Sequence, residues 1–204
     1  MSFAKILRRE CDENPRKRGF MRLKFVVCKV LQREAYFVAA RSKNVVDVEI
    51  LPQGLHDEPD RLREELQKAI ASDSDIRGRK YDAVLLGYGL CSNGIVGLTC
   101  QVPLVVVRAH DCITLFLGSK EKYREYFDTH RGIYWYSPGW IECNIQPGPE
   151  RNQKMLDFYQ EKYGPDNAAF LMETEQSWMK EYSVAGFVCW PQLDQPKYRD
   201  YTRK

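Results

Sequence analysis

Thiol and imidazole side chains follow four apolar runs in the first 112 residues of the chain. The runs cover residues 21–28, 45–51, 81–88 and 103–109. The side chains at or just beyond their ends are Cys28, His56, Cys91, His110 and Cys112. If the runs are parallel strands, their carboxyl ends share one edge of a sheet, where open α/β sheets bind ligands. Thiolate and imidazole ligands favour zinc or iron over magnesium or calcium, so the pattern predicts a transition-metal site at this edge.

A glycine-rich segment around Cys91 carries the strongest part of this prediction. Glycines after a buried strand allow a tight turn and close approach of a ligand to the backbone. The turn residues expected to contact a bound cofactor are Gly87, Gly89, Ser92, Asn93 and Gly94. We expect Cys91 near a helix N-terminus, where the helix dipole favours a thiolate. The spacing does not match a dinucleotide fingerprint and lacks the lysine of a Walker motif. A small buried cysteine in a glycine-rich turn is the structural alternative.

The segment His110-Asp111-Cys112 supplies the second part of the predicted metal site. In extended geometry His110 and Cys112 project to one side of the chain, and Asp111 between them either caps a helix or orients an imidazole. We predict a metal bound by Cys91, His110 and Cys112, with His56 or Cys28 as the fourth contact. An ordinary capped helix start, with an incidental histidine and cysteine, is the structural alternative.

A second chemistry uses the same residues without a metal. Cys91 would be the nucleophile, His110 its general base, and Asp111 the group that orients the imidazole. An iron–sulfur cluster is a further form of the metal hypothesis, since cysteine thiolates are its usual ligands. The residues alone leave open whether the protein is an enzyme.

Alternating strand and helix patterns predict the scaffold that positions these side chains. Helices are expected over residues 32–41 and after three side chains that can cap a helix N-terminus, which are Asp57, Asp111 and Ser119. The fold class is therefore α/β, with a mainly parallel sheet of four to five strands flanked by helices in a Rossmann-like, three-layer arrangement. After Gly132 the pattern changes to a helical and aromatic segment. We predict a flexible basic arm over 1–20, one domain over 21–190 and a polar tail over 191–204.

Composition and charge exclude several classes of protein. The net charge of +3 gives no electrostatic case for nucleic acid. The first 20 residues lack the apolar stretch of a signal peptide, and no apolar run approaches the length of a membrane span. We therefore expect a cytoplasmic protein with no membrane partner. Seven cysteines in a reducing compartment favour buried, redox or ligand thiols over a disulfide framework.

These segments together resemble an uncharacterised bacterial and archaeal family, DUF1638. The resemblance rests on residues 51–56, 86–94, 108–114, 117–119, 136–142 and 163–168. Its characteristic residues carry over as Cys28, His56, Cys91, His110, Asp111 and Cys112. Similar proteins often occur beside corrinoid-dependent methyltransferases, which implies a role in methyl-group or corrinoid metabolism. The resemblance also implies that a corrinoid is a further cofactor and that a corrinoid protein or methyltransferase is the partner. A non-catalytic accessory role is then an alternative. Similar proteins usually continue with another helix and strand, so the expectation is a shortened member or an incomplete C-terminal half.

Overall fold

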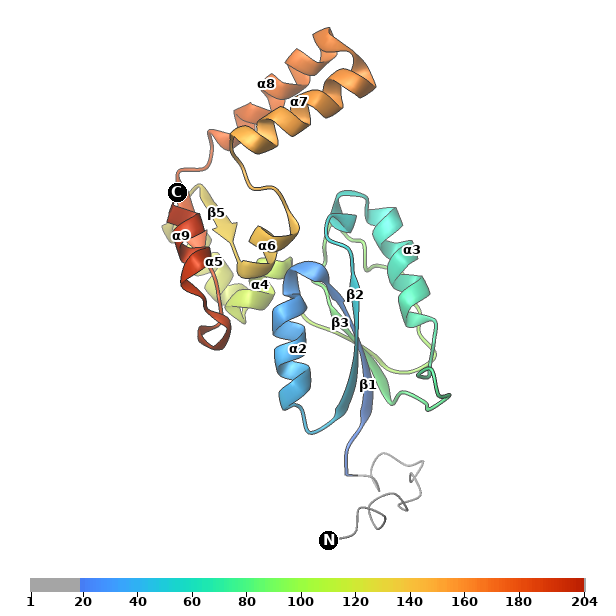
Figure 1. The fold of residues 1–204 in the computed structure, drawn as a ribbon. Helices are drawn as coiled ribbons and strands as arrows, with labels where there is room; N and C mark the ends of the chain where they lie inside the picture. The colour runs from blue at the N-terminus through green and yellow to red at the C-terminus, as the bar shows by residue number, and fades with distance from the viewer. Residues whose placement is uncertain (1–18, 204) are drawn as a thin grey trace. The chain divides into compact units, whose positions relative to one another are not determined.

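Four parallel strands form the sheet of the N-terminal half, in the order β2-β1-β3-β4 (Figure 1). Their bounds are Arg22–Cys28 for β1, Val45–Leu51 for β2, Ala83–Gly87 for β3 and Leu104–Val106 for β4. The computed structural model describes residues 19–203. The chain divides into two compact units between Arg108 and Ala109, and this sheet belongs to the first. The predicted parallel α/β sheet is confirmed.

Helix α3 (Pro59–Ile70) covers one face of the sheet and helix α2 (Gln32–Arg41) covers the other (Figure 1). Leu62, Leu66 and Ile70 of α3 recur every fourth residue, which places them on one side of the helix. They pack against three strand residues that are also fully or almost fully buried, which are Val26, Val84 and Leu86. The three layers that the sequence predicts are therefore present in this unit.

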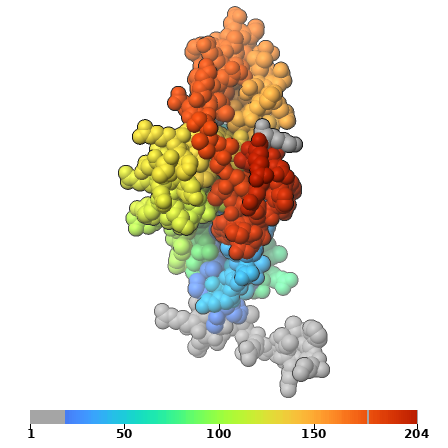
Figure 2. Space-filling model, turned by 90° about the vertical axis from the view of Figure 1, so that its left-hand side faces the viewer, coloured from blue at the N-terminus to red at the C-terminus, as the bar shows by residue number. Residues whose placement is uncertain are grey.

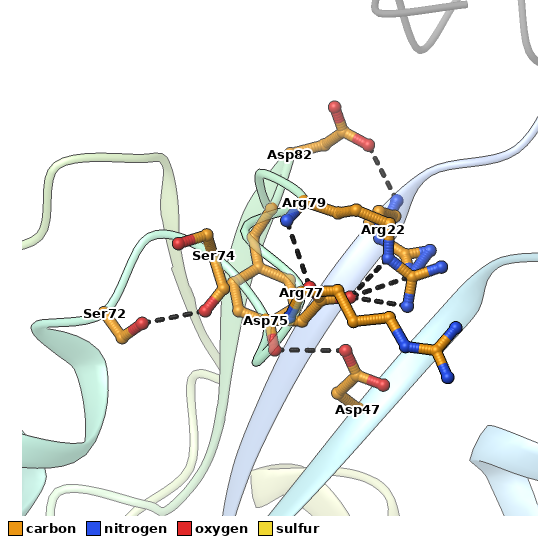
Figure 3. Close-up of polar contacts among 9 residues, drawn as sticks. Arg22, Asp47, Ser72, Ser74, Asp75, Arg77, Arg79 and Asp82 are labelled. Carbon is orange, nitrogen blue, oxygen red and sulfur yellow. Dashed lines mark hydrogen bonds and ion pairs between the residues drawn. The ribbon is translucent and has the colours of Figure 1, made fainter. Parts of the chain in front are cut away.

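An ion-pair network closes the amino edge of the sheet (Figure 3). Asp75 lies at its centre, and its carboxylate contacts the guanidinium groups of Arg22 at 3.2 Å and Arg79 at 2.6 Å. The same carboxylate accepts hydrogen bonds from the backbone N–H groups of Arg77 and Arg79. Burial alone would raise the pKa of Asp75, but these hydrogen bonds and the Arg79 charge lower the pKa to about 2. The network therefore holds Asp75 ionised.

Two further contacts tie this edge together. The backbone N–H of Arg22 donates to the Asp82 carboxylate at 2.7 Å, which joins the start of β1 to the segment before β3 (Figure 3). The hydroxyl of Tyr81 donates to the Asp47 carboxylate at 3.0 Å, and burial together with that carboxylate raises the pKa of Tyr81 to about 12. Asp82 and Asp47 thus each accept a hydrogen bond at this edge, and the Nε atom of Arg22 is buried without a partner among the described residues.

The second unit contains a two-stranded parallel sheet and most of the remaining helices. Strand β5 (Ile133–Tyr136) pairs with β6 (Val184–Phe187). The helices are α4 (Cys112–Leu117), α5 (Lys120–Thr129), α6 (Pro138–Cys143), α7 (Pro149–Tyr163), α8 (Pro165–Met179) and α9 (Pro196–Arg203). Helices α7 and α8 pack side by side as a hairpin, seen in orange shades in Figure 2. The aromatic segment expected after Gly132 is confirmed as β5 and the helices that follow it.

Two of the three predicted helix caps are present in the structure. Asp111 and Ser119 cap α4 and α5 as predicted, each accepting a hydrogen bond from a backbone N–H three residues on. The predicted Asp57 cap is wrong, because Asp57 ends the short 3-10 helix η3 (Leu55–Asp57) and Glu58 precedes α3 without a capping bond. The tail after residue 190 contains α9, in which Tyr198 is buried.

Some predictions about the chain's organisation are not tested. The basic arm over 1–20 lies, apart from its last two residues, outside the described residues. The single domain over 21–190 stays a prediction beside the two compact units. Within residues 19–203, no helix has the length and apolar character needed to cross a bilayer.

Candidate functional site

The carboxyl ends of β1, β2 and β3 lie side by side in the N-terminal unit. Cys28 is the last residue of β1 and pairs in register with Leu51, the last residue of β2. Val27 pairs with Gly87, so Tyr88 begins the loop directly beyond the adjacent strand. The half-buried Cys28 and Cys91 both pack against the apolar cluster that contains Tyr88 and Leu55. This edge therefore brings two thiols and one tyrosine to the same apolar cluster.

Tyr88 is the buried centre of this group, with 4% of its surface exposed. Its hydroxyl makes no hydrogen bond to an oxygen or nitrogen atom of residues 19–203. Burial raises the pKa of Tyr88 far above its usual range, and the neighbouring Cys28 and Cys91 groups raise it further. The hydroxyl therefore stays protonated, and the sulfur atoms are its polar neighbours.

The turn after Tyr88 holds three successive side chains in the left-handed region of the backbone map. The φ angles are 44° at Cys91, 56° at Ser92 and 66° at Asn93. Residues other than glycine adopt this conformation rarely and with strain. The expected helix after the turn is wrong: residues 91–97 form successive turns, so Cys91 does not lie at a helix N-terminus. Any stabilisation of its thiolate must come from another source.

Helix α3 holds this strained turn in place through two side chains on its surface. The guanidinium of Arg63 donates to the carbonyl of Val96 at 2.8 Å and to that of Asn93 at 3.4 Å. The amide of Gln67 donates to the Thr99 carbonyl at 2.9 Å and accepts from the Thr99 N–H at 3.0 Å. These bonds satisfy backbone groups that a loop without regular structure would otherwise leave to water.

Two glycines predicted to contact a cofactor have a packing role in the structure. A Cβ atom at Gly94 would lie 2.5 Å from a methyl group of Leu62, which is fully buried in α3. A Cβ atom at Gly87 would lie 2.4 Å from a methyl group of Val27 on the neighbouring strand. The close approach of chain segments explains both glycines. Contacts with a cofactor stay a prediction for all of the turn residues named from the sequence, which are Gly87, Gly89, Ser92, Asn93 and Gly94.

His56 lies on the same side of the unit, just beyond the end of β2. It belongs to η3 directly after Leu55, which is buried in the apolar cluster with Tyr88. Its Nε2 atom lies 3.4 Å from a carboxylate oxygen of Asp57, and 42% of its side chain is exposed. His56 is therefore a solvent-accessible imidazole attached to the edge that carries the two thiols.

The segment His110-Asp111-Cys112 belongs to the second unit and begins α4. Asp111 accepts hydrogen bonds from the backbone N–H of Thr114 at 2.9 Å and from its hydroxyl at 3.0 Å. The imidazole of His110 is largely exposed, with Nδ1 3.7 Å from the other Asp111 oxygen. Asp111 thus acts as a helix cap here. The hypothesis that His110 and Cys112 act together with Cys91 stays a prediction, because the two segments belong to different units.

A second tyrosine interacts with this segment. Tyr123 of α5 is partly buried, which raises its pKa, and the charge and hydrogen bond of Asp111 raise it further, with a smaller effect from Cys112. The second unit therefore repeats a feature of the first, in which a tyrosine hydroxyl lies near a cysteine. Sequence analysis identified neither Tyr88 nor Tyr123 as a site residue. Tyr88 stands between two glycines at the end of an apolar strand, which is the one signal that could have indicated it.

The thiols of the described part of the chain are not joined in disulfides. Cys28, Cys91, Cys100, Cys112, Cys143 and Cys189 are all partly exposed thiols. Among residues 19–203, no three or more histidine, cysteine, aspartate or glutamate side chains are grouped in a way that could hold a metal ion. The arrangement at the carboxyl edge is therefore a pair of thiols with a buried phenol, and an imidazole nearby on η3.

Comparison with known proteins adds one finding. The family model described as a protein of unknown function, DUF1638, matches residues 50–204. The match includes the strained turn, His56 and the segment at His110, and it begins beyond Cys28. No curated protein and no solved structure matches the chain.

Proposed function

The chain belongs to the DUF1638 family, and we propose that it binds a transition metal, zinc or iron, through the thiolates of Cys28 and Cys91. The observation that carries this proposal is the presence of two thiols from separate chain segments around the buried hydroxyl of Tyr88. Sulfur ligands select soft or borderline metals and exclude magnesium and calcium as the preferred ions. Placement at the carboxyl edge of a parallel sheet agrees with the general position of ligand sites in such folds.

His56 is the ligand that we add from the same unit. It is exposed, attached to the same edge through Leu55, and carries a nitrogen that suits zinc or iron. Two thiolates and one imidazole would leave one position of a tetrahedral metal open, as in catalytic zinc sites. A metal in such a site supplies Lewis acidity or activates a bound nucleophile. The side chains must move to reach it, since no group of three ligands is preformed within residues 19–203.

Metal analysis of protein purified without oxygen tests the proposal. We expect about one zinc or iron per chain in the wild-type protein, as for a single site. Cys28→Ser and Cys91→Ser should each lose most of it. Cys100→Ser is the matched control, because Cys100 is also partly exposed and packs against the same apolar cluster. Equal metal content in all of these proteins would overturn the ligand assignment.

The same measurement tests the larger site predicted from the sequence. His110→Ala and Cys112→Ser should reduce metal content if these side chains are also ligands. Cys143→Ser, a partly exposed thiol of the same unit, is the control for them. Full metal content in His110→Ala and Cys112→Ser would limit the site to the N-terminal unit.

The strained turn favours a second candidate, in which Cys91 is a nucleophile without metal. Cys91 lies in a sharp turn beyond a strand with φ of 44°, which resembles the strained turn that exposes the nucleophile of α/β-hydrolases. In metal-free protein, iodoacetamide should then alkylate Cys91 at least tenfold faster than Cys100, as expected for a thiolate of lowered pKa. Equal alkylation rates at neutral pH would exclude this candidate.

A further inference from the structure

Cys28 and Cys91 lie close to each other because both are next to one buried hydroxyl group. The Tyr88 hydroxyl donates a hydrogen bond to the sulfur of Cys28, and Cys91 lies near the same hydroxyl. Val27 pairs with Gly87 across β1 and β3, so the backbone also places the end of β1 beside the loop that begins at Tyr88. Two separate strand ends thus bring together two thiols that are not joined in a disulfide.

The backbone holds these two thiols with different firmness. Cys28 ends a strand that pairs with β2 on one side and with β3 on the other. Cys91 begins the strained turn, with φ of 44°, in a segment that has no regular helix or strand. A disulfide requires the two Cα atoms to lie within about 7 Å of each other and the two sulfur atoms to meet. The turn can supply any movement that this requires, while the strand keeps the other sulfur in place.

Both cysteines are partly exposed, so a small reagent can reach them. Accessible cysteines that stand next to a second thiol are the usual sites of reversible oxidation by peroxide. We infer that Cys28 and Cys91 form a redox-active pair that reduces a peroxide and becomes a disulfide. This inference goes beyond the proposed metal site, because it uses the same two thiols without a metal.

The oxidation takes place in two steps. The sulfur of one thiol attacks an oxygen atom of hydrogen peroxide, the O–O bond breaks, and water leaves, so that this cysteine becomes a sulfenic acid. The second thiol then attacks the oxidised sulfur, the S–O bond breaks, and a second water leaves as the disulfide forms. The two thiols give up two electrons and two protons, and the peroxide is reduced to two water molecules. A thiol reductant restores the pair by exchange.

The test uses reduced protein from which a chelator has removed any metal, treated with a small excess of hydrogen peroxide. The number of titratable thiols should fall by two from the seven of the reduced chain, and dithiothreitol should restore both. Mass spectrometry of a non-reduced digest should show one peptide that contains Cys28 joined to one that contains Cys91. The link should form at least about tenfold faster in the folded protein than in urea, because the fold raises the local concentration of one thiol around the other.

Cys100→Ser is the matched control. Cys100 packs against the same apolar cluster, but its sulfur lies 3.6 Å from the carbonyl of Ile70 at the end of α3. This variant should form the link as the wild type does, whereas Cys28→Ser and Cys91→Ser, checked for folding by circular dichroism, should lose it. A folded wild-type protein that loses no thiols, that links Cys100 or a second chain instead, or that reacts no faster than in urea would overturn the inference. Because no metal is present, this result and the metal analysis can each fail alone.

Discussion

The two edges of the N-terminal sheet differ in how their buried polar groups are paired. At the amino edge Asp75 contacts two guanidinium groups and two backbone N–H groups, and Arg22 joins two separate carboxylates. At the carboxyl edge the buried hydroxyl of Tyr88 has no oxygen or nitrogen partner among residues 19–203, Cys28 and Cys91 lie near it, and three residues of the adjacent turn are strained. The Nε atom of Arg22 at the amino edge is also buried without a partner among these residues, so the two edges differ in their charge pairing and in the strain of the turn.

Tyr81 and Tyr88 allow the two edges to be compared through a single type of residue. The two tyrosines are 7% and 4% exposed, and both lie close to β3, one before it and one after it. Among the described residues, Tyr81 has a carboxylate acceptor and Tyr88 has none. Because residue type and burial are nearly the same, the difference comes from what surrounds each hydroxyl. Amino acid type and burial alone therefore do not show whether a tyrosine hydroxyl has a carboxylate acceptor.

The largest expected effect concerns the amino edge. Arg22→Ala should lower the free energy of unfolding by about 3 kcal/mol, because it removes one partner of a buried ion pair. The Arg22 and Asp75 side chains are only 8% and 7% exposed. Chemical denaturation followed by circular dichroism measures the loss. Arg77→Ala, which keeps the backbone N–H that Asp75 uses, should change stability by less than about 0.5 kcal/mol. Equal effects of the two variants would contradict the structural role assigned to this edge.

Acid should reduce the stability that the ion-pair network around Asp75 contributes at the amino edge. The pKa of Asp75 is about 2 in the folded protein, below its ordinary value of 3.8. A lowered pKa contributes stability that is complete above about pH 4 and is lost as the pH falls toward 2. We expect the loss to be smaller than that in Arg22→Ala, because a protonated carboxyl group still accepts hydrogen bonds. Thermal unfolding between pH 5 and pH 2 should show this decline, and Asp75→Asn should show a flatter profile.

The two tyrosines should respond differently when each loses its hydroxyl. Tyr81→Phe removes a hydrogen bond to a carboxylate and should lower the free energy of unfolding by about 1.5 kcal/mol. Tyr88→Phe removes a donor that has no oxygen or nitrogen acceptor within residues 19–203, so its change should lie within about 0.5 kcal/mol of zero in metal-free protein. Denaturation of both variants without metal provides the comparison. A large loss in Tyr88→Phe would show that the hydroxyl already has a strong acceptor.

The smallest expected effect is local. Arg63→Ala removes the guanidinium that binds the carbonyls of Asn93 and Val96. Amide hydrogen exchange in residues 91–97 should become about fivefold faster, which corresponds to about 1 kcal/mol of local stability. Exchange at the amino edge should not change. Arg61→Ala is the control, because Arg61 makes an exposed ion pair with Glu58 on the same helix. Slow exchange in both variants would show that the turn does not depend on Arg63.

Strand and helix patterns predicted most of the N-terminal fold because its elements have regular, local signals. The helix over residues 32–41 and the strand over 45–51 have the bounds expected from the sequence, and Pro52 and Gly54 mark the end of the strand. The turn after β3 could not be predicted in the same way. Its conformation depends on Arg63 and Gln67, which are about thirty residues away in the chain and have no local signal.

The site was predicted in part for a related reason. Parallel pairing follows from the strand pattern, so the meeting of Cys28 with the loop that carries Cys91 could be expected. The burial of Tyr88 beside these thiols could not be expected in the same way, because it depends on how distant parts of the chain pack around one side chain. Asp111 was assigned two roles from the sequence, and the structure shows the helix cap.

The left-handed turn over residues 91–93 has a consequence for protein engineering. Glycine would relieve backbone strain at Ser92, because glycine adopts positive φ angles without steric conflict. Directed evolution for heat resistance alone would then tend to replace this side chain, whereas selection in living cells would tend to keep it if the turn contacts a ligand. A library randomised at this position and sorted under each pressure would separate the demands of folding from those of chemistry.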